Sequence, residues 1–299
     1  MNPFFNLWKA AQLLFVTASS TLKPPQEVLQ IQSGGIKIPA ALYIPKGRPK
    51  FPGVLLCHGL TPKGGEEPRV IQFANALQRI GCAVLVPTFP EASNLRIDPK
   101  TIQQIIDSSL SLLNQEMIDA KKNGLFGVSF GGTLAFIASQ DLKIRDKIAW
   151  LGSLGAFASL EAILNYGLTG KYSVSQDIFS LPPDPYAKQI LKDQFGHPND
   201  FSLNVEEFRN KYSEQIEKLS VNFDLKLSPK IKILLIHSED DSVVPWPEMT
   251  KLAQIFEQKG LLLETYLLKN ASHAQVKKWW IHKNYLRAAK ALVRLSLGE

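Results

Sequence analysis

From residue 50 onward, the hydrophobic positions alternate between two patterns. Short uninterrupted apolar runs are typical of buried strands, and apolar residues that recur every three or four positions are typical of helices. The runs predict strands at 54–57, 82–86, 125–128, 148–151, 231–236 and 261–268. The helical spacing predicts helices at 70–80, 98–117, 133–140, 247–260 and 281–295. Strands and helices that alternate in this way form a mostly parallel sheet with helices on both faces.

Two extended runs precede this alternation, at 28–32 and 36–44. Ser33-Gly34-Gly35 separates them, and a Gly-Gly pair between two extended runs predicts a β-hairpin. With the hairpin included, the prediction is a mostly parallel sheet of eight strands.

One stretch, 155–227, interrupts the rhythm. It holds the proline-rich segment Leu181-Pro182-Pro183-Asp184-Pro185 and many aromatic side chains. A structureless loop of this length is uncommon in a compact domain, so we predict a mostly helical insertion over one end of the sheet. The chain then divides into an N-terminal apolar helix and linker, 1–25, and one domain, 26–299, with a cap insertion at about 155–227.

The composition is that of a globular protein. The chain has 299 residues, of which 45% are apolar and 20% are charged. These values are close to the average for globular domains and exclude a disordered chain, a collagen-like repeat and a coiled coil. The formal net charge is +7, but the lysines and arginines are scattered, and we expect no nucleic-acid partner.

The two cysteines of the sequence, Cys57 and Cys82, both lie in apolar runs. The sequence has no Cys-x-x-Cys pair and no Cys/His cluster, which excludes a structural zinc site. We expect small buried thiols in a reducing compartment, and therefore a cytoplasmic protein. Because no nucleotide motif or cofactor lysine appears either, no cofactor is predicted.

The N-terminal apolar segment, Phe4 to Val16, has 13 positions, fewer than the ~20 that span a bilayer. We favour a short amphipathic helix that packs on the body of the protein. An alternative is peripheral membrane contact through this segment and the basic last helix. The basic residues are Lys277, Lys278, Lys283, Arg287, Lys290 and Arg294. A signal peptide is less favoured, because no basic residue precedes the segment.

The segment Gly127-Val128-Ser129-Phe130-Gly131 has the pattern Gly-x-Ser-x-Gly and lies between a predicted strand and a predicted helix. Such a turn holds the serine in a strained conformation with its hydroxyl exposed, and larger residues in place of the glycines would collide. This context makes Ser129 a candidate nucleophile. The alternative is a tight turn whose serine has no chemical role.

A serine hydroxyl is a poor nucleophile until a base takes its proton. His273 lies between the last strand and the last helix, where sites gather in open α/β sheets. Of the five histidines, it alone combines this loop position with a serine and an acid ahead of it in the chain. The acid candidates Glu239, Asp240 and Asp241 follow the strand at 231–236, and their position leaves all three open.

Together these residues resemble the α/β-hydrolase family, most closely its serine esterases and dienelactone-hydrolase-like members. The order of serine, acid and histidine is the family's order, and the acid loop of the family reads Gly-x-x-Asp-x-x-Val-Pro. Here the loop reads Ser238-Glu239-Asp240-Asp241-Ser242-Val243-Val244-Pro245. The resemblance therefore implies Asp241 as the acid, with Ser238 in place of the usual glycine. Dienelactone hydrolases use a cysteine nucleophile, so their specific activity is not implied.

The segment Cys57-His58-Gly59-Leu60 resembles the family's His-Gly-x segment after the third strand. The resemblance implies that the backbone N–H groups of Leu60 and Phe130 form an oxyanion hole, and that His58 is structural. It also implies that the third and fourth strands are parallel neighbours, which keeps Cys57 and Cys82 too far apart for a disulfide.

We therefore expect an α/β-hydrolase fold and a serine hydrolase that cleaves a carboxylic ester through an acyl-enzyme, with Ser129, Asp241 and His273 as catalytic residues. The partner is a small-molecule ester, and the cap would bind its apolar acyl or alcohol group. Phe179 and Phe208 are candidate lining residues. A peptidase or acyltransferase with the same triad, and a ligand-binding protein without catalysis, remain as alternatives.

Overall fold

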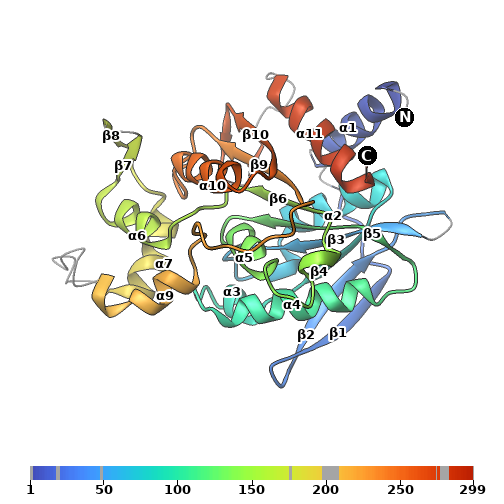
Figure 1. Ribbon diagram of the computed structural model, residues 1–299, viewed down its shortest axis with the longest axis horizontal. Coiled ribbons are helices and arrows are strands. Elements are labelled where there is room, and N and C mark those ends of the chain that lie inside the picture. The colour runs from blue at the N-terminus through green and yellow to red at the C-terminus, as the bar shows by residue number, and fades with distance from the viewer. Residues whose placement is uncertain are drawn as a thin grey trace.

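The computed structural model describes residues 3–17, 21–47, 50–174, 177–196, 209–273, 275–276 and 283–298. Figure 1 shows a central sheet with helices on both of its faces and the insertion at one end. The N-terminal helix α1 and the C-terminal helix α11 lie side by side (Figure 1).

The sheet has eight strands in the order β1-β2-β4-β3-β5-β6-β9-β10. β2 pairs antiparallel with β1 and with β4, and the other neighbours are parallel. The predicted eight-stranded, mostly parallel sheet is thus confirmed. The strands are β1 Glu27–Ser33, β2 Ile36–Tyr43, β3 Phe51–Cys57, β4 Ala83–Pro87, β5 Ile118–Val128, β6 Trp150–Leu154, β9 Lys232–Ser238 and β10 Leu262–Leu268.

The central strands are apolar throughout because helices cover both faces of the sheet. Every residue of β4 is buried. β3 and β4 are parallel neighbours, with Gly53 opposite Ala83. Cys57 ends β3 and Cys82 precedes β4, and both thiols are buried and free.

Two groups of three helices cover the sheet. One face carries α1, α2 and α11, and the other carries α4, α5 and α10. On the second face, the rings of Phe136 and Phe256 pack 5.1 Å apart between α5 and α10. The helices are α1 Pro3–Thr17, α2 Pro68–Ile80, α4 Lys100–Leu113, α5 Phe130–Ala138, α10 Pro247–Gln258 and α11 Lys283–Leu297, with a short α3 at Pro90–Ser93.

The largest difference from the predicted boundaries lies between α4 and β5. α4 ends at Leu113 rather than at 117, and β5 begins at Ile118 rather than at 125. The carbonyl of Met117 accepts a hydrogen bond from Phe51 N at the head of β3 (2.8 Å). Hydrogen bonding to the sheet therefore begins at Met117, although the helical spacing of apolar residues extends that far. The polar residues that follow belong to β5 because they continue this strand.

The insertion between β6 and β9 contains helices and one hairpin. Its elements are α6 Leu160–Thr169, β7 Lys171–Val174, β8 Asp177–Ser180, α7 Pro185–Phe195 and α9 Ser213–Lys218. The hairpin β7–β8 was not predicted. Its strands are short and largely exposed, and Tyr172 stacks on Phe179 with ring centroids 5.8 Å apart. Pairing of aromatic side chains across the strands supplies stability that burial does not.

Several hydrogen bonds fix the insertion to the loops after β9. The carbonyl of Ser242 accepts from Asp184 N (2.8 Å) and from the Tyr166 hydroxyl (3.1 Å). The buried carboxylate of Glu248, in the first turn of α10, accepts from the N–H groups of Ala158 and Ser159 (3.1 and 2.9 Å). The cap is thereby held over the loop that carries the acid candidates.

α1 packs on α2 and α11, as favoured from the sequence. Ala10, Leu13 and Leu14 are buried, and Lys9 donates to the carbonyl of Ile80 at the end of α2. No helix in the described part of the chain is long and apolar enough to span a bilayer.

Candidate active site

Ser129 occupies a strained turn between β5 and α5. Its φ of 55° and ψ of −130° place a residue with a side chain in a region that costs free energy and needs support from its surroundings. A Cβ at Gly127 would lie 2.3 Å from Gly132 Cα, and one at Gly131 would lie 2.3 Å from the carbonyl oxygen of His58. Only glycine allows these approaches, which explains the Gly-x-Ser-x-Gly pattern.

Asp241 and His273 are joined by a hydrogen bond. His273 Nδ1 lies 2.7 Å from Asp241 Oδ2, and the other carboxylate oxygen accepts from the N–H groups of Val243 and Val244, each at 2.9 Å. Asp241 is 1% exposed, so its charge depends on these donors. Because Nδ1 of His273 donates to the carboxylate, Nε2 is left with its lone pair, ready to accept a proton.

The other two acid candidates lie in different surroundings. Glu239 forms an ion pair with Lys269 at 3.4 Å, and Asp240 is an exposed residue, in contrast to buried Asp241. Position in the sequence left three acids open, and the geometry brings Asp241 to the imidazole.

His273 and Ser129 line one cavity. Gly155, with φ +70°, makes room beside them, because a Cβ there would lie 3.2 Å from His273 Cε1 and 3.5 Å from Asp241 Oδ2. The structure thus gathers a strained serine, an imidazole and a buried carboxylate from three separate loops at the carboxyl ends of parallel strands.

Leu60 and Phe130 border the same cavity. Phe130 is the first residue of α5, and the first N–H groups of a helix have no acceptor within it. Leu60 follows Gly59, where a Cβ would lie only 3.0 Å from Ser129 Cβ. Both candidate oxyanion donors are therefore on backbone that passes close to the serine.

Three solved hydrolase structures resemble this architecture. Pyrococcus horikoshii acylaminoacyl peptidase matches with a TM-score of 0.60 and 16% identity over 94% of this chain and 42% of that chain. For 2,6-dihydroxy-pseudo-oxynicotine hydrolase the TM-score is 0.65 and the identity 18%, over 97% of this chain and 74% of that chain. For Pyrobaculum calidifontis esterase they are 0.61 and 15%, over 97% and 90%.

The chain has the α/β-hydrolase fold. It spans less than half the length of the acylaminoacyl peptidase that it matches. Neither a scan with protein-family models nor a search of curated proteins found a match.

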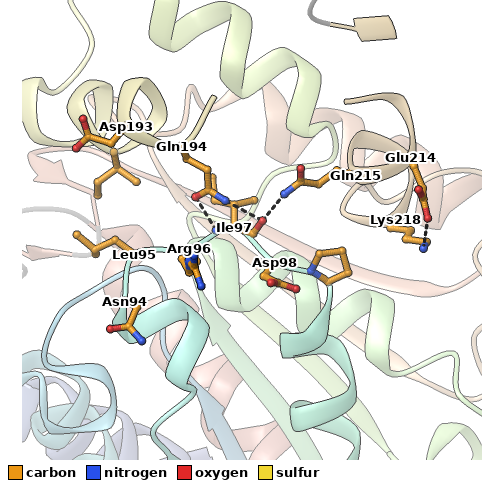
Figure 2. A pocket seen from close by; sticks show the side chains of 12 residues that line it. Asn94, Leu95, Arg96, Ile97, Asp98, Asp193, Gln194, Glu214, Gln215 and Lys218 are labelled. Atoms are coloured by element: carbon orange, nitrogen blue, oxygen red, sulfur yellow. Dashed lines mark hydrogen bonds and ion pairs between the residues drawn. The ribbon is translucent and has the colours of Figure 1, made fainter. Parts of the chain in front are cut away.

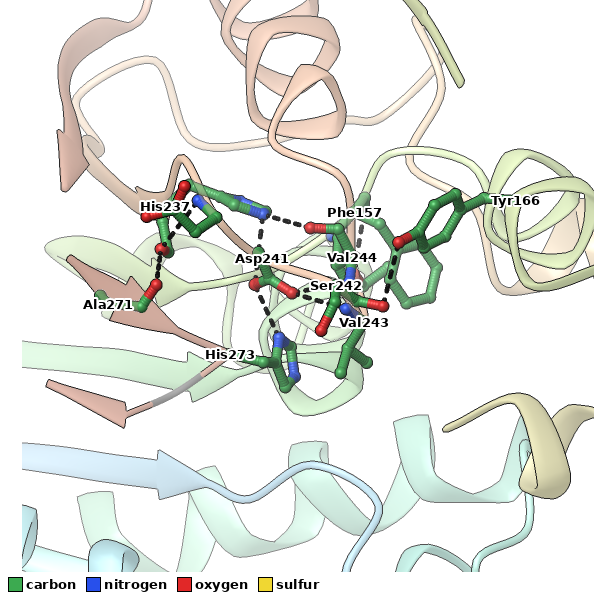
Figure 3. A network of polar contacts seen from close by, with 12 residues as sticks. Phe157, Tyr166, His237, Asp241, Ser242, Val243, Val244, Ala271 and His273 are labelled. Carbon is green, nitrogen blue, oxygen red and sulfur yellow. Dashed lines mark hydrogen bonds and ion pairs between the residues drawn. The ribbon is translucent and has the colours of Figure 1, made fainter. Parts of the chain in front are cut away.

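A buried histidine, His237, lies beside Asp241 (Figure 3). His237 Nε2 donates to the carbonyl of Val244 (2.8 Å) and lies 3.6 Å from Asp241 Oδ2. Burial lowers the pKa of His237 and keeps the ring neutral. Burial by itself raises the pKa of Asp241, but His273, His237 and the hydrogen bonds outweigh it, so this pKa lies below its usual value. The sequence analysis did not single out His237, although its place four residues before Asp241 was the available signal.

His58 has both ring nitrogens engaged. Nδ1 donates to the carbonyl of Gly59 (2.7 Å), and Nε2 accepts from Phe89 N (3.0 Å). The ring is 1% exposed, and it ties the loop that carries Leu60 to the segment after β4. This geometry agrees with the structural role implied by the resemblance.

The cavity beside Ser129 has a volume of about 830 Å³ and extends in two directions. One part, here called the cap arm, runs beneath the insertion and is lined by Phe157, Leu160, Ile163, Tyr186, Ala187 and Ile190. The other, the α1 arm, runs between three helices and is lined by Leu13, Leu14, Thr17, Phe73, Ala288 and Leu292. The sequence analysis expected the first part and missed the second.

The expectation that Phe179 and Phe208 line the cap arm is not confirmed. Phe179 lies on β8 with 45% exposure, outside the described lining of the cavity, because it stacks on Tyr172 in the unpredicted hairpin. Phe208 lies outside the described residues.

A second cavity, of about 810 Å³, separates the cap from the body of the domain near Ile97 (Figure 2). The side-chain amide of Gln194 bonds both backbone groups of Ile97, and Gln215 donates to the same carbonyl. These bonds attach α7 and α9 to the segment before α4. No catalytic candidate lines this cavity, so we assign it to the joint between cap and body.

The environment of His58 predicts a pH dependence of stability. Burial lowers the pKa of His58 to about 4, whereas the pKa of histidine in an unfolded chain is about 6.5. Between these values the unfolded state binds one more proton, so the free energy of unfolding falls as the pH drops and is constant above about pH 7. We expect His58 to account for a loss of about 2–3 kcal/mol between pH 7.5 and 4.5.

Urea unfolding of the wild type and of His58→Asn at both pH values checks this expectation. The variant should have a lower free energy of unfolding at pH 7.5, but this free energy should fall less between pH 7.5 and 4.5 than that of the wild type. An equal fall in the two proteins would contradict the role of His58.

Proposed function

We propose that the protein is a serine hydrolase that cleaves a carboxylic ester through an acyl-enzyme. The observation that carries the proposal is the hydrogen bond of His273 Nδ1 to buried Asp241, which orients an imidazole whose Nε2 shares one cavity with the strained Ser129. A serine with no chemical role in a tight turn would need neither His273 nor Asp241 nearby. The similarity to hydrolases of the same fold supports this assignment.

In the proposed reaction, Ser129 Oγ attacks the carbonyl carbon of the ester while His273 Nε2 takes the hydroxyl proton. Asp241 stabilises the resulting imidazolium. The N–H groups of Leu60 and Phe130 donate to the oxyanion, and each such donor lowers a barrier by roughly 3–4 kcal/mol. The carbon–oxygen bond to the alcohol breaks as His273 returns the proton to it. Water, activated by the same imidazole, then releases the acid from Ser129.

The cavity wall favours an ester over a peptide. The surfaces of both arms next to Ser129 are mainly aliphatic and aromatic. A peptide would bring several backbone N–H and C=O groups against them, and polar groups buried without partners are costly. An ester with an apolar acyl or alcohol group leaves few such groups unpaired. Peptide hydrolysis and acyl transfer remain the competing outcomes, because the same acyl-enzyme serves all three.

Covalent labelling tests the proposal. A fluorophosphonate probe should label the wild type at Ser129 and should not label Ser129→Ala, because the phosphonate reacts only with an activated serine. The labelled peptide is identified by mass spectrometry. Absence of labelling in a folded wild type would point to a ligand-binding protein, and labelling at another residue would overturn the choice of nucleophile. Rates with p-nitrophenyl esters and with acyl-peptide anilides then separate esterase from peptidase.

The neighbouring acids provide a matched pair of variants. Asp241→Asn removes the charge that faces His273, and by analogy with serine proteases we expect kcat to fall by about 10⁴. Asp240→Asn makes the same chemical change one residue away, where the carboxylate does not contact the imidazole, and should alter kcat by less than about tenfold. The measurement is p-nitrophenyl ester hydrolysis by both variants, and the reverse ranking would assign the acid to Asp240.

A further inference from the structure

The cavity reaches well beyond the cap. The α1 arm continues from Ser129 between α1, α2 and α11, and its wall is mainly aliphatic and aromatic, with Thr17 of α1 and Arg69 and Gln72 of α2 among the polar residues that line the cavity. Leu13, Leu14 and Leu292, which line the arm, are buried side chains. A mainly apolar space next to a nucleophile suits an unbranched hydrocarbon group, since it offers burial of apolar surface and few polar partners.

α1 is apolar on its outer side as well. Leu7, Trp8 and Phe15 are 38%, 63% and 71% exposed, and Trp8 and Phe15, seven residues apart, lie on one face of the helix. Lys9 is the one charged residue in α1, and it is bonded to the end of α2. The helix therefore separates the cavity from solvent while presenting large apolar side chains to both.

A basic stripe accompanies this apolar face. α11 packs against α1, and the two helices lie side by side in Figure 1. α11 contains no acidic residue, and its exposed side chains include Lys283, Arg287, Lys290 and Arg294. Their spacing of four, three and four residues places them on one face. Arg294 also pairs with Glu264 of β10. Exposed aromatic residues on one helix and a row of cations on the helix packed beside it match the interface of a membrane with anionic headgroups.

We propose that α1 lies on an anionic lipid surface and that the α1 arm receives the long acyl chain of an ester taken from that surface. This inference rests on the proposed serine hydrolase activity. The acyl carbonyl lies at Ser129 with its chain beneath α1, and the alcohol lies towards the cap arm. Attack by Ser129 breaks the ester carbon–oxygen bond and releases the alcohol with the proton relayed by His273. Water then releases a fatty acid.

The first experiment measures binding to vesicles and does not depend on catalysis. Full-length Ser129→Ala protein should sediment with vesicles of phosphatidylcholine and phosphatidylserine. Trp8→Glu/Phe15→Glu in the same background should weaken binding by at least about tenfold, because two aromatic side chains lose their burial. Phe223→Glu is the control, since Phe223 is an aromatic residue with 56% exposure far along the chain from α1. Arg287→Glu/Lys290→Glu should weaken binding to anionic vesicles more than to neutral ones.

Equal binding by the Trp8/Phe15 variant and its parent would overturn the docking of α1. So would a finding that these residues mediate association with a second copy, seen as a dimer in sedimentation that the variant abolishes. These outcomes concern α1 alone and leave the fluorophosphonate result untouched.

The second experiment assigns the arms with one substitution made at two places. Ala288→Leu narrows the α1 arm from α11, and Ala187→Leu narrows the cap arm from α7. The readout is the ratio of kcat/KM for dodecanoyl over acetyl p-nitrophenyl esters. Ala288→Leu should lower this ratio by roughly fourfold for each methylene displaced, whereas Ala187→Leu should leave it near the wild-type value. Thermal unfolding identifies a variant that fails to fold, for which Leu292→Phe is the substitute.

A fall in the ratio for Ala187→Leu alone would place the acyl chain under the cap and overturn the assignment of the α1 arm. No change in either variant would do the same. Failure of the proposed function is distinct, because it would appear as no turnover of any ester and no labelling of Ser129.

Discussion

The close approach of three backbone segments around Ser129 is the constraint on which the rest of the structure depends. The turn after β5 must pass within contact distance of the start of α5 and of the carbonyls of Cys57 and His58 at the end of β3. This is possible only if β3 and β5 are neighbours in the sheet, which they are. The same contact brings the loop after β3 beside the serine. The strand order therefore determines two features of the site together. It allows the strained turn at Ser129, and it places the candidate oxyanion donors beside the serine.

A buried charge imposes the second constraint. Asp241 is almost inaccessible to water, and an isolated carboxylate there would become protonated. Two backbone N–H groups and the imidazole of His273 stabilise its charged form, and neutral His237 lies beside it. The same loop bonds the cap through the carbonyl of Ser242. A displacement of the cap would therefore move the loop that carries Asp241. Because Asp241 orients His273, the position of the cap affects the orientation of the imidazole.

The sequence predicted those parts of the molecule that depend on local pattern. The eight strands, the principal helices and the turn at Ser129 all have a periodic or glycine-based signature. The choice of Asp241 among three acids came from resemblance, because side-chain direction in a loop is set by contacts from elsewhere, here by His273. The hairpin β7–β8 was missed since its strands are four residues each and largely exposed, so neither carries the apolar alternation of a half-buried strand.

The α1 arm could not be predicted for a different reason. Its walls come from helices that begin at residues 3, 68 and 283, and no sequence spacing indicates that they meet beside Ser129. The sequence predicted an amphipathic helix packed on the body, whereas in the structure α1 has large apolar residues on its exposed side as well, which a helix packed on a protein surface does not need. Leu13 and Leu14 are buried against the body of the protein, which explains the apolar residues on one side of α1. Trp8 and Phe15 remain exposed to water, and packing within this chain does not offset the free-energy cost of that exposure. In the proposed membrane contact, the apolar part of a lipid surface would cover Trp8 and Phe15, and the basic face of α11 would favour a surface with negative charge.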